Sequence, residues 1–128
     1  MAPERASEPE ASLEPVRWEI AEPDARARAR REKLPMLVYL RADWAVASAQ
    51  MEREVWTDER VIRASRAFVA LKIDLTRAEG DAELYAERYS APAVPAVLVF
   101  DADGRRVGII AGRTGAGEIL EAMERATE

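Results

Sequence analysis

The sequence predicts one α/β domain in which a central mixed β-sheet is flanked by helices. Two continuous apolar runs of strand length, 36–40 and 68–75, are separated by a helical pattern, as expected for parallel strands buried on both faces. A third run, 96–100, is followed by the turn sequence Asp-Ala-Asp-Gly and a returning segment, which predicts an antiparallel hairpin. A chain of 128 residues is long enough for one such domain without a disulfide or metal to stabilise it.

The N-terminal segment differs in composition from the rest of the chain. Residues 1–15 are rich in Pro, Glu, Ser and Ala and contain one Leu. Such a composition does not offset the entropy lost on ordering, which predicts a disordered tail followed by a folded domain over 16–128. The domain is expected to begin with a half-buried strand over 16–20 and a polar helix over 24–33, entered through Pro23.

Helical spacing of apolar residues predicts the remaining helices. Four further helical segments are predicted. The first begins at Ala45, and the second runs over 57–66 with Thr57 as its N-cap. The third runs over 80–89, and the last runs over 118–126. The connection 112–117 lacks the lysine of a phosphate-binding loop and is interpreted as a plain strand-to-helix loop. The predicted order is therefore β-α-β-α-β-α-β-β-α, a parallel half followed by a hairpin and a helix.

The amino-acid composition of the chain excludes several classes of function. The chain has no Cys, which excludes thiolate nucleophiles and disulfides, and no His, which removes the commonest metal ligand and general base. We therefore expect no metal and no cofactor. A net charge of -5 gives no electrostatic reason to bind nucleic acid or an anionic membrane. No apolar run approaches the roughly 20 residues that span a bilayer, so no membrane insertion is expected.

The first residues bear on the compartment. Glu4, Glu8 and Glu10 stand where a signal peptide would carry basic residues and an apolar segment. As written, the sequence predicts a cytoplasmic protein. A periplasmic location is the alternative if the chain begins inside a longer protein.

Three local patterns resemble the thioredoxin superfamily. The segment 39–48 reads YLRADWAVAS and is similar to a strand, the active-site loop Ala-Asp-Trp-Cys-x-x-Cys and a helix. The segment 93–96 is similar to the loop whose proline is cis in that family, which implies a cis bond before Pro95. The segment 100–104, with Gly112 after it, is similar to the family's last hairpin. The subgroup that the chain most resembles is the C-terminal domain of transmembrane thiol:disulfide interchange reductases, which implies a bacterial protein.

This resemblance covers 18–126 and implies a thioredoxin fold with an N-terminal β-α extension. The two redox cysteine positions are occupied by Ala45 and Ser48, and the buried carboxylate that the family commonly has six positions before the first cysteine is Tyr39. A methyl group cannot attack a disulfide, and a serine hydroxyl cannot form a mixed disulfide. We therefore expect no catalytic residue, no enzyme activity and a degenerate site.

A site of this family that has lost its thiols still has a surface that can bind another chain. In thioredoxins the site loop, the cis-proline loop and the loop before the last helix form a shallow apolar groove that binds extended backbone. The corresponding residues here are Trp44, Ala45, Val46, Ala47, Val94, Pro95, Arg113 and Thr114. The leading hypothesis is a redox-inactive protein-interaction module (an adaptor, assembly factor or chaperone-like subunit) that binds another protein or an extended peptide segment.

Two alternatives stay open. In the first, the chain is a thiol–disulfide oxidoreductase represented by a cysteine-free engineered variant. In the second, it is a structural subunit whose contacts lie on the first helix, and the arginines of that helix are Arg26, Arg28, Arg30 and Arg31. Contacts through those arginines would be electrostatic and would weaken with salt. The natural codons at positions 45 and 48 separate the first alternative from the interaction module.

Overall fold

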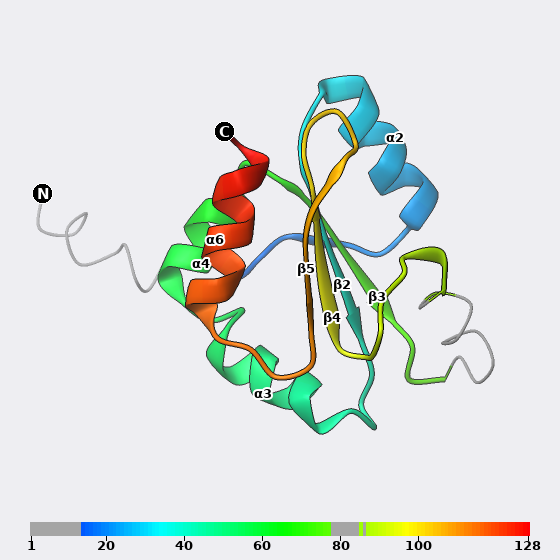
Figure 1. Cartoon of the computed structure of the whole chain (residues 1–128), viewed down its shortest axis with the longest axis vertical. Helices are drawn as coiled ribbons and strands as arrows, with labels where there is room; N and C mark the ends of the chain where they lie inside the picture. The colour runs from blue at the N-terminus through cyan, green and yellow to red at the C-terminus, as the bar shows by residue number, and fades with distance from the viewer. Residues whose placement is uncertain (1–13, 78–84, 86) are drawn as a thin grey trace, which may run out of the picture.

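A five-stranded mixed sheet forms the centre of the protein (Figure 1). The structure is a computed structural model and describes residues 14–77, 85 and 87–128. The sheet has the order β1-β3-β2-β4-β5, and its strands are β1 (Trp18–Glu19), β2 (Met36–Arg41), β3 (Val69–Asp74), β4 (Ala96–Phe100) and β5 (Arg106–Ala111). Strands β1, β3 and β2 are parallel, whereas β4 runs antiparallel to β2 and β5 antiparallel to β4. The predicted parallel half and terminal hairpin are confirmed.

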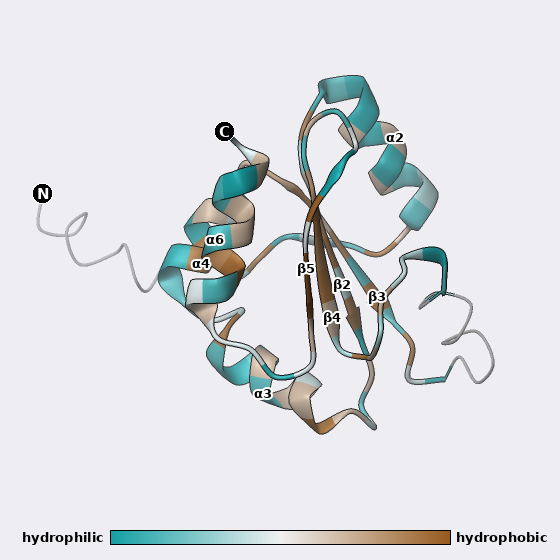
Figure 2. Cartoon of the chain, in the orientation of Figure 1, coloured by the Kyte–Doolittle hydropathy of each residue, from teal (hydrophilic) through white to brown (hydrophobic). Residues whose placement is uncertain are grey.

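Helices cover both faces of this sheet. They are α2 (Glu22–Glu32), α3 (Val46–Glu54), α4 (Glu59–Ser65) and α6 (Ala116–Ala126). Figure 1 shows α4 and α6 side by side on one face of the sheet and α2 on the opposite face. Figure 2 shows the corresponding pattern of hydropathy, with hydrophobic strands in the centre and hydrophilic residues along the outer side of α2.

The core is divided by the sheet into two apolar layers. All six residues of β2 are buried, and successive side chains point to opposite faces. Leu37 and Tyr39 therefore pack with α3, α4 and α6, whereas Val38 and Leu40 pack in the layer that contains Ala25 of α2. The continuous apolar run that predicted β2 is thus explained by helices on both of its faces.

Several predicted element boundaries are wrong, each for a local reason. Helix α2 begins at Glu22 and not at Asp24, because the Ala25 N–H already donates to the Ala21 carbonyl (3.0 Å). The N-cap of α4 is Asp58 and not Thr57, because the Asp58 carboxylate accepts from the Arg60 N–H (2.9 Å) while the Thr57 hydroxyl donates to a carbonyl at the end of α3. The first strand is shorter than predicted, because only Trp18 and Glu19 pair with β3. Helix α6 begins at Ala116 and not two residues later, because Glu118 reaches back to the Gly115 N–H (3.4 Å).

Two predictions fall largely on residues that the structure does not describe. The predicted helix over 80–89 lies mostly outside the described residues. The same holds for the predicted tail over 1–15, of which Glu14 and Pro15 are described. Both of their carbonyl oxygens accept from the Arg66 guanidinium, at 2.7 Å for Glu14 and 3.2 Å for Pro15.

Candidate functional site

The degenerate site lies where β2 ends and α3 begins. Residues 42–45 form the connecting loop, and Ala45 is the N-cap residue of α3. Leu40 pairs with Ala96 in the neighbouring strand, which places the Val94–Pro95 bond beside this loop. That peptide bond is cis.

The third loop that the sequence assigned to the site, which precedes α6, joins the other two through hydrogen bonds. The Gly112 N–H donates to the Pro95 carbonyl (2.8 Å), which ties this loop to the cis-proline loop. The Gln50 side-chain amide donates to the Thr114 carbonyl (3.1 Å), which ties it to α3. The structure therefore brings together the three segments that the resemblance placed at one site.

The eight residues named from the sequence differ in exposure. Trp44 is 58% exposed and Val46 is 86% exposed, and in the described part of the chain the one other exposed large hydrophobic side chain is Ile20. Ala47 and Val94 are half-buried, Arg113 is exposed, and the buried members are Ala45, Pro95 and Thr114. The buried three shape the loops, so the side chains that a partner can reach are Trp44, Val46, Ala47, Val94 and Arg113, hereafter the Trp44 surface.

Ser48 has a structural role in this arrangement. Its side chain is fully buried, and its hydroxyl oxygen accepts from the Ala42 N–H (3.2 Å). Its own N–H donates to the Ala45 carbonyl (2.9 Å) in the first turn of α3. The hydroxyl thus fixes the loop to the helix.

Tyr39 lies beneath the site, at the position where the family resemblance expects a carboxylate. Its ring packs against Trp18 and Trp56, with centroids 5.6 Å and 5.0 Å away, and these two indoles also contact each other (5.0 Å). Its hydroxyl donates to Glu52 (3.0 Å) and lies 3.3 Å from the Ser48 carbonyl oxygen. Burial, together with the charge of the Glu52 carboxylate, raises the pKa of Tyr39. The phenol therefore stays protonated at neutral pH and cannot take up a proton.

A buried arginine anchors the loop that carries Trp44. The Arg41 guanidinium contacts three carboxylates, those of Glu52 (2.7 Å), Asp43 (2.8 Å) and Asp74 (3.1 Å). Burial lowers the pKa of Arg41, but the hydrogen bonds and charges of these carboxylates outweigh it and the net shift is upward. Thr76 completes the cluster, since its hydroxyl oxygen accepts from the Asp43 N–H (2.9 Å).

The sequence analysis missed this cluster. The available signal was Arg41 itself, a charged residue that directly follows the apolar run 36–40 and is the last residue of β2. Charged side chains in such positions are rarely buried unless they are paired. Its partners Asp74 and Thr76 lie at the end of β3 and just beyond it, and the parallel pairing of β2 with β3 brings them to the same edge of the sheet.

The Arg41 cluster should contribute measurably to stability. In Arg41→Leu, three carboxylates lose their common cation and the Trp44 loop loses its anchor. Because these carboxylates are partly exposed, we expect the free energy of unfolding to fall by about 1–3 kcal/mol in urea denaturation. The matched control is Arg53→Leu on the exposed side of α3, for which we expect a change within about 0.5 kcal/mol. Equal effects of the two substitutions would contradict the anchoring role of Arg41.

The described residues contain neither a metal-binding cluster nor a membrane-spanning helix. Among them, no group of three or more His, Cys, Asp or Glu side chains is arranged to hold a metal ion. None of the described helices combines the length and the apolar character needed to cross a membrane.

The sequence of the chain is similar to those of thioredoxin-like proteins and thiol:disulfide interchange proteins. The profile of the thioredoxin-like family matches residues 17–102. The thiol:disulfide interchange protein DsbD of Ralstonia nicotianae is 33% identical over 93 residues, which cover 72% of this chain and 15% of that protein. The protein of the same name from Pseudoalteromonas atlantica is 31% identical over 81 residues, which cover 63% of this chain and 14% of that protein. The chain therefore matches a small part of the length of these relatives.

Structural comparison agrees. The oxidised C-terminal domain of DsbD from Neisseria meningitidis superimposes with a TM-score of 0.69 at 19% identity, over 87% of this chain and 100% of that domain. A thioredoxin from Thermus thermophilus superimposes with a TM-score of 0.72 at 23% identity, over 88% of this chain and 87% of that protein. At these identities the likeness shows the fold alone. It confirms the predicted thioredoxin fold, and with the sequence matches it confirms the predicted resemblance to interchange-protein C-terminal domains.

Proposed function

Because this chain belongs to the thioredoxin-like family and has no cysteine, we propose that it is a redox-inactive protein-interaction module whose contact surface is the Trp44 surface. One observation carries the proposal. Trp44 and Val46 remain exposed directly beside the positions where the family carries its thiols. Exposed apolar side chains that cluster on a soluble protein commonly mark a contact site, and without thiols this cluster has no chemical task.

The rigid support of the loop favours binding. Asp43 is held by the Arg41 guanidinium through its side chain and by Thr76 through its backbone N–H. The next residue is Trp44, so its backbone is fixed before a partner arrives. A surface that is ordered in advance loses less conformational entropy on binding, which increases the affinity that a small contact area can reach.

The cis-proline loop supports an extended segment as the partner. Among the described residues, no backbone hydrogen bond to the Val94 peptide groups is found, although the Pro95 carbonyl beside them is paired with Gly112. An extended backbone can form strand-like hydrogen bonds with the Val94 peptide groups while its apolar side chains cover Trp44 and Val46. The partner class that fits is therefore an extended peptide segment of another protein with apolar side chains.

The ion pairs of the arginine-rich first helix, α2, favour the Trp44 surface over that helix as the contact site. Arg26 lies 3.4 Å from Glu22, Arg28 lies 2.5 Å from Glu19, and Arg31 lies 3.3 Å from Glu32. These carboxylates of the same region neutralise three of the four arginines. An acidic partner would have to displace these pairs.

A thiol–disulfide oxidoreductase with replaced cysteines is the second candidate function. It is favoured by the names of the sequence relatives, which are thiol:disulfide interchange proteins. Tyr39 disfavours this candidate. The family commonly has a buried carboxylate at that position, and an engineer who replaces the two cysteines has no need to change it. Cysteine codons at positions 45 and 48 of the natural gene would establish this second candidate, and alanine and serine codons would exclude it.

Affinity capture with matched variants tests the interaction module. The unsubstituted chain, Trp44→Ala and Ile20→Ala are used as baits in extracts of the source organism. Ile20 is the appropriate control because it is also a large exposed hydrophobic residue, at 82%, and lies outside the Trp44 surface. We expect the unsubstituted chain and Ile20→Ala to retain the same partner and Trp44→Ala to lose it. Equal recovery by all three baits would refute the proposed surface. The test is independent of compartment, since a chain without thiols has no redox state to preserve.

A further inference from the structure

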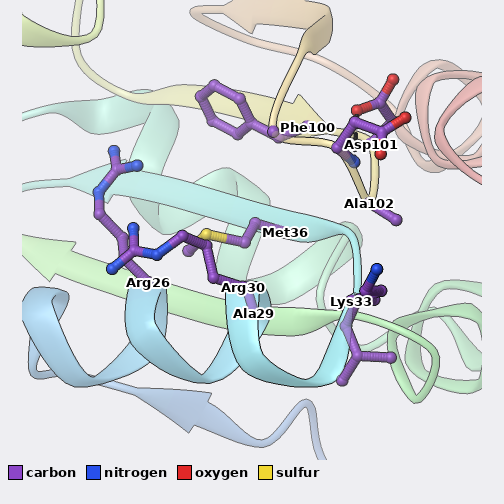
Figure 3. A pocket seen from close by; sticks show the side chains of 11 residues that line it. Arg26, Ala29, Arg30, Lys33, Met36, Phe100, Asp101 and Ala102 are labelled. Atoms are coloured by element: carbon purple, nitrogen blue, oxygen red, sulfur yellow. Dashed lines mark hydrogen bonds between the residues drawn. The ribbon is translucent and has the colours of Figure 1, made fainter.

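A hollow opens at the other end of the sheet, between α2 and the turn that joins β4 to β5 (Figure 3). Its volume is about 360 Å³. It lies beside Met36, the first residue of β2, and Phe100, the last residue of β4. The Trp44 surface follows the opposite end of β2, so the two features are separated by the length of that strand.

The hollow combines an apolar floor with a basic wall. The floor is formed by the apolar residues Ala29, Leu34, Met36 and Phe100. The wall is formed by three basic residues of the first helix and its C-terminus, Arg26, Arg30 and Lys33. Figure 3 shows Arg26 and Arg30 extending from α2 toward the strands that carry Met36 and Phe100.

Two of these cations are available to a ligand. Arg26 forms an ion pair with the Glu22 carboxylate (3.4 Å), and its guanidinium carbon lies 6.0 Å from the centre of the Phe100 ring. The other arginines of α2 that form ion pairs are Arg28, with Glu19 of β1 and with Glu32, and Arg31, with Glu32. In the part of the chain that the structure describes, neither Arg30 nor Lys33 lies within 4.0 Å of a carboxylate oxygen.

The two acidic side chains across the hollow, those of Asp101 and Asp103, both have partners within the turn. One Asp101 carboxylate oxygen accepts from the Asp103 N–H (3.0 Å) and from the Arg105 N–H (2.9 Å), which closes the turn. The Asp103 carboxylate lies 3.9 Å from the Arg105 guanidinium. Three basic and two acidic side chains line the hollow, and among the described residues Arg30 and Lys33 have no carboxylate oxygen within 4.0 Å, so the hollow favours a negatively charged ligand.

The walls are formed before any ligand binds. Ala29 is buried, which fixes α2 against the sheet. On the other side, Gly104 adopts φ +86°, a conformation that favours glycine, and its N–H donates to the Asp101 carbonyl (2.9 Å). A preformed hollow of this volume lies at the lower end of the range of small-molecule sites, roughly 300–1,000 Å³.

We propose that this hollow binds a small organic anion with a flat apolar body. Arg30 and Lys33 hold the anionic group, a carboxylate, sulfonate or phosphate, and the apolar body lies against Met36 and Phe100. The site is separate from the Trp44 surface and does not depend on the proposed function.

Two fluorescent probes with nearly the same ring system test the chemistry of the ligand. 1-Anilinonaphthalene-8-sulfonate has an apolar body and a sulfonate, and N-phenyl-1-naphthylamine has the same body without the charge. We expect the sulfonate probe to bind the full chain at least about tenfold more tightly than the neutral probe, a difference of about 1.4 kcal/mol. Equal affinity of the two probes would overturn the proposal.

Two adjacent arginines of α2 provide matched variants. Arg30→Glu changes a residue that lines the hollow, and Arg31→Glu makes the same change of charge at an exposed neighbour that does not line it. We expect Arg30→Glu to raise the Kd of the sulfonate probe about tenfold or more and Arg31→Glu to change it less than about twofold. Equal effects of the two substitutions would show general electrostatic attraction and refute the site.

Backbone amide shifts in nuclear magnetic resonance locate the bound probe. We expect the sulfonate probe to shift the amides of Ala29, Ala102 and Gly104. Shifts centred instead on the apolar groove between α4 and α6, which contains Phe68 and Leu120, would place the probe elsewhere and overturn the proposal. Shifts centred on Trp44 would overturn it as well, whereas loss of partner binding in Trp44→Ala would leave it unaffected.

Discussion

The double variant Ala45→Cys/Ser48→Cys should reduce insulin disulfides, whereas the unsubstituted chain should show no turnover above a cysteine-free control protein. Ala45 is the N-cap residue of α3, and no acidic residue lies in the first turn of that helix. A thiolate at position 45 would therefore meet the uncompensated positive end of the helix, which lowers the pKa of a thiol. Position 48 follows in the same turn, where its N–H already donates to the carbonyl of residue 45 (2.9 Å).

The single variant Ala45→Cys is the matched control for this experiment. Its thiolate can attack a disulfide once but has no second thiol to release the mixed disulfide. We expect the double variant to exceed it by at least about tenfold in steady-state turnover, because only a dithiol completes the exchange. If the double variant is no faster than the single variant, the loops do not keep the geometry of a redox site and the likeness to the family ends at the fold.

Truncating Trp44 should weaken partner binding by about 30-fold. Buried tryptophan anchors at interfaces commonly contribute about 2 kcal/mol or more, and each 1.4 kcal/mol corresponds to about tenfold in affinity. Titration calorimetry with the captured partner measures the effect. Because the Trp44 side chain is more than half exposed in the free protein, we expect the free energy of unfolding of Trp44→Ala to fall by less than about 1 kcal/mol.

Ile20→Ala is the control for loss of exposed apolar area. Ile20 lies between β1 and α2, on a different part of the surface, and we expect its truncation to change the Kd less than about twofold. A loss of affinity below about threefold in Trp44→Ala would show that the indole ring is not an anchor.

Much of the fold could be predicted because burial on both faces produces continuous apolar runs. Such runs identified β2 and β3, and the Asp-Ala-Asp-Gly turn identified the hairpin of β4 and β5. The boundaries were less predictable because they depend on which side chain reaches a free N–H. Both Thr57 and Asp58 are good N-cap residues, and only the structure shows that Asp58 makes the bond.

The location of the candidate site could be predicted from the sequence, but the contacts that hold its loops in place could not. The resemblance located the three loops, and the structure brings them together. Exposure could not be read from the pattern, since Thr114 is buried and Arg113 beside it is exposed. The Arg41 cluster and the hollow beside Arg30 depend on contacts between segments far apart in the chain, which local spacing does not reveal.

Site-specific photo-cross-linking tests the proposed contact surface most directly. A photoreactive phenylalanine analogue is placed at position 46, within the Trp44 surface, or at position 31, on the exposed side of α2, and the protein is irradiated in cells of the source organism. Both positions are exposed, so a photoreactive group at either of them is accessible to a partner protein. We predict a covalent adduct with one partner from position 46, its loss when Trp44→Ala is added, and no adduct with that partner from position 31. An adduct with the partner from position 31 and none from position 46 would contradict the account and move the interface to the first helix.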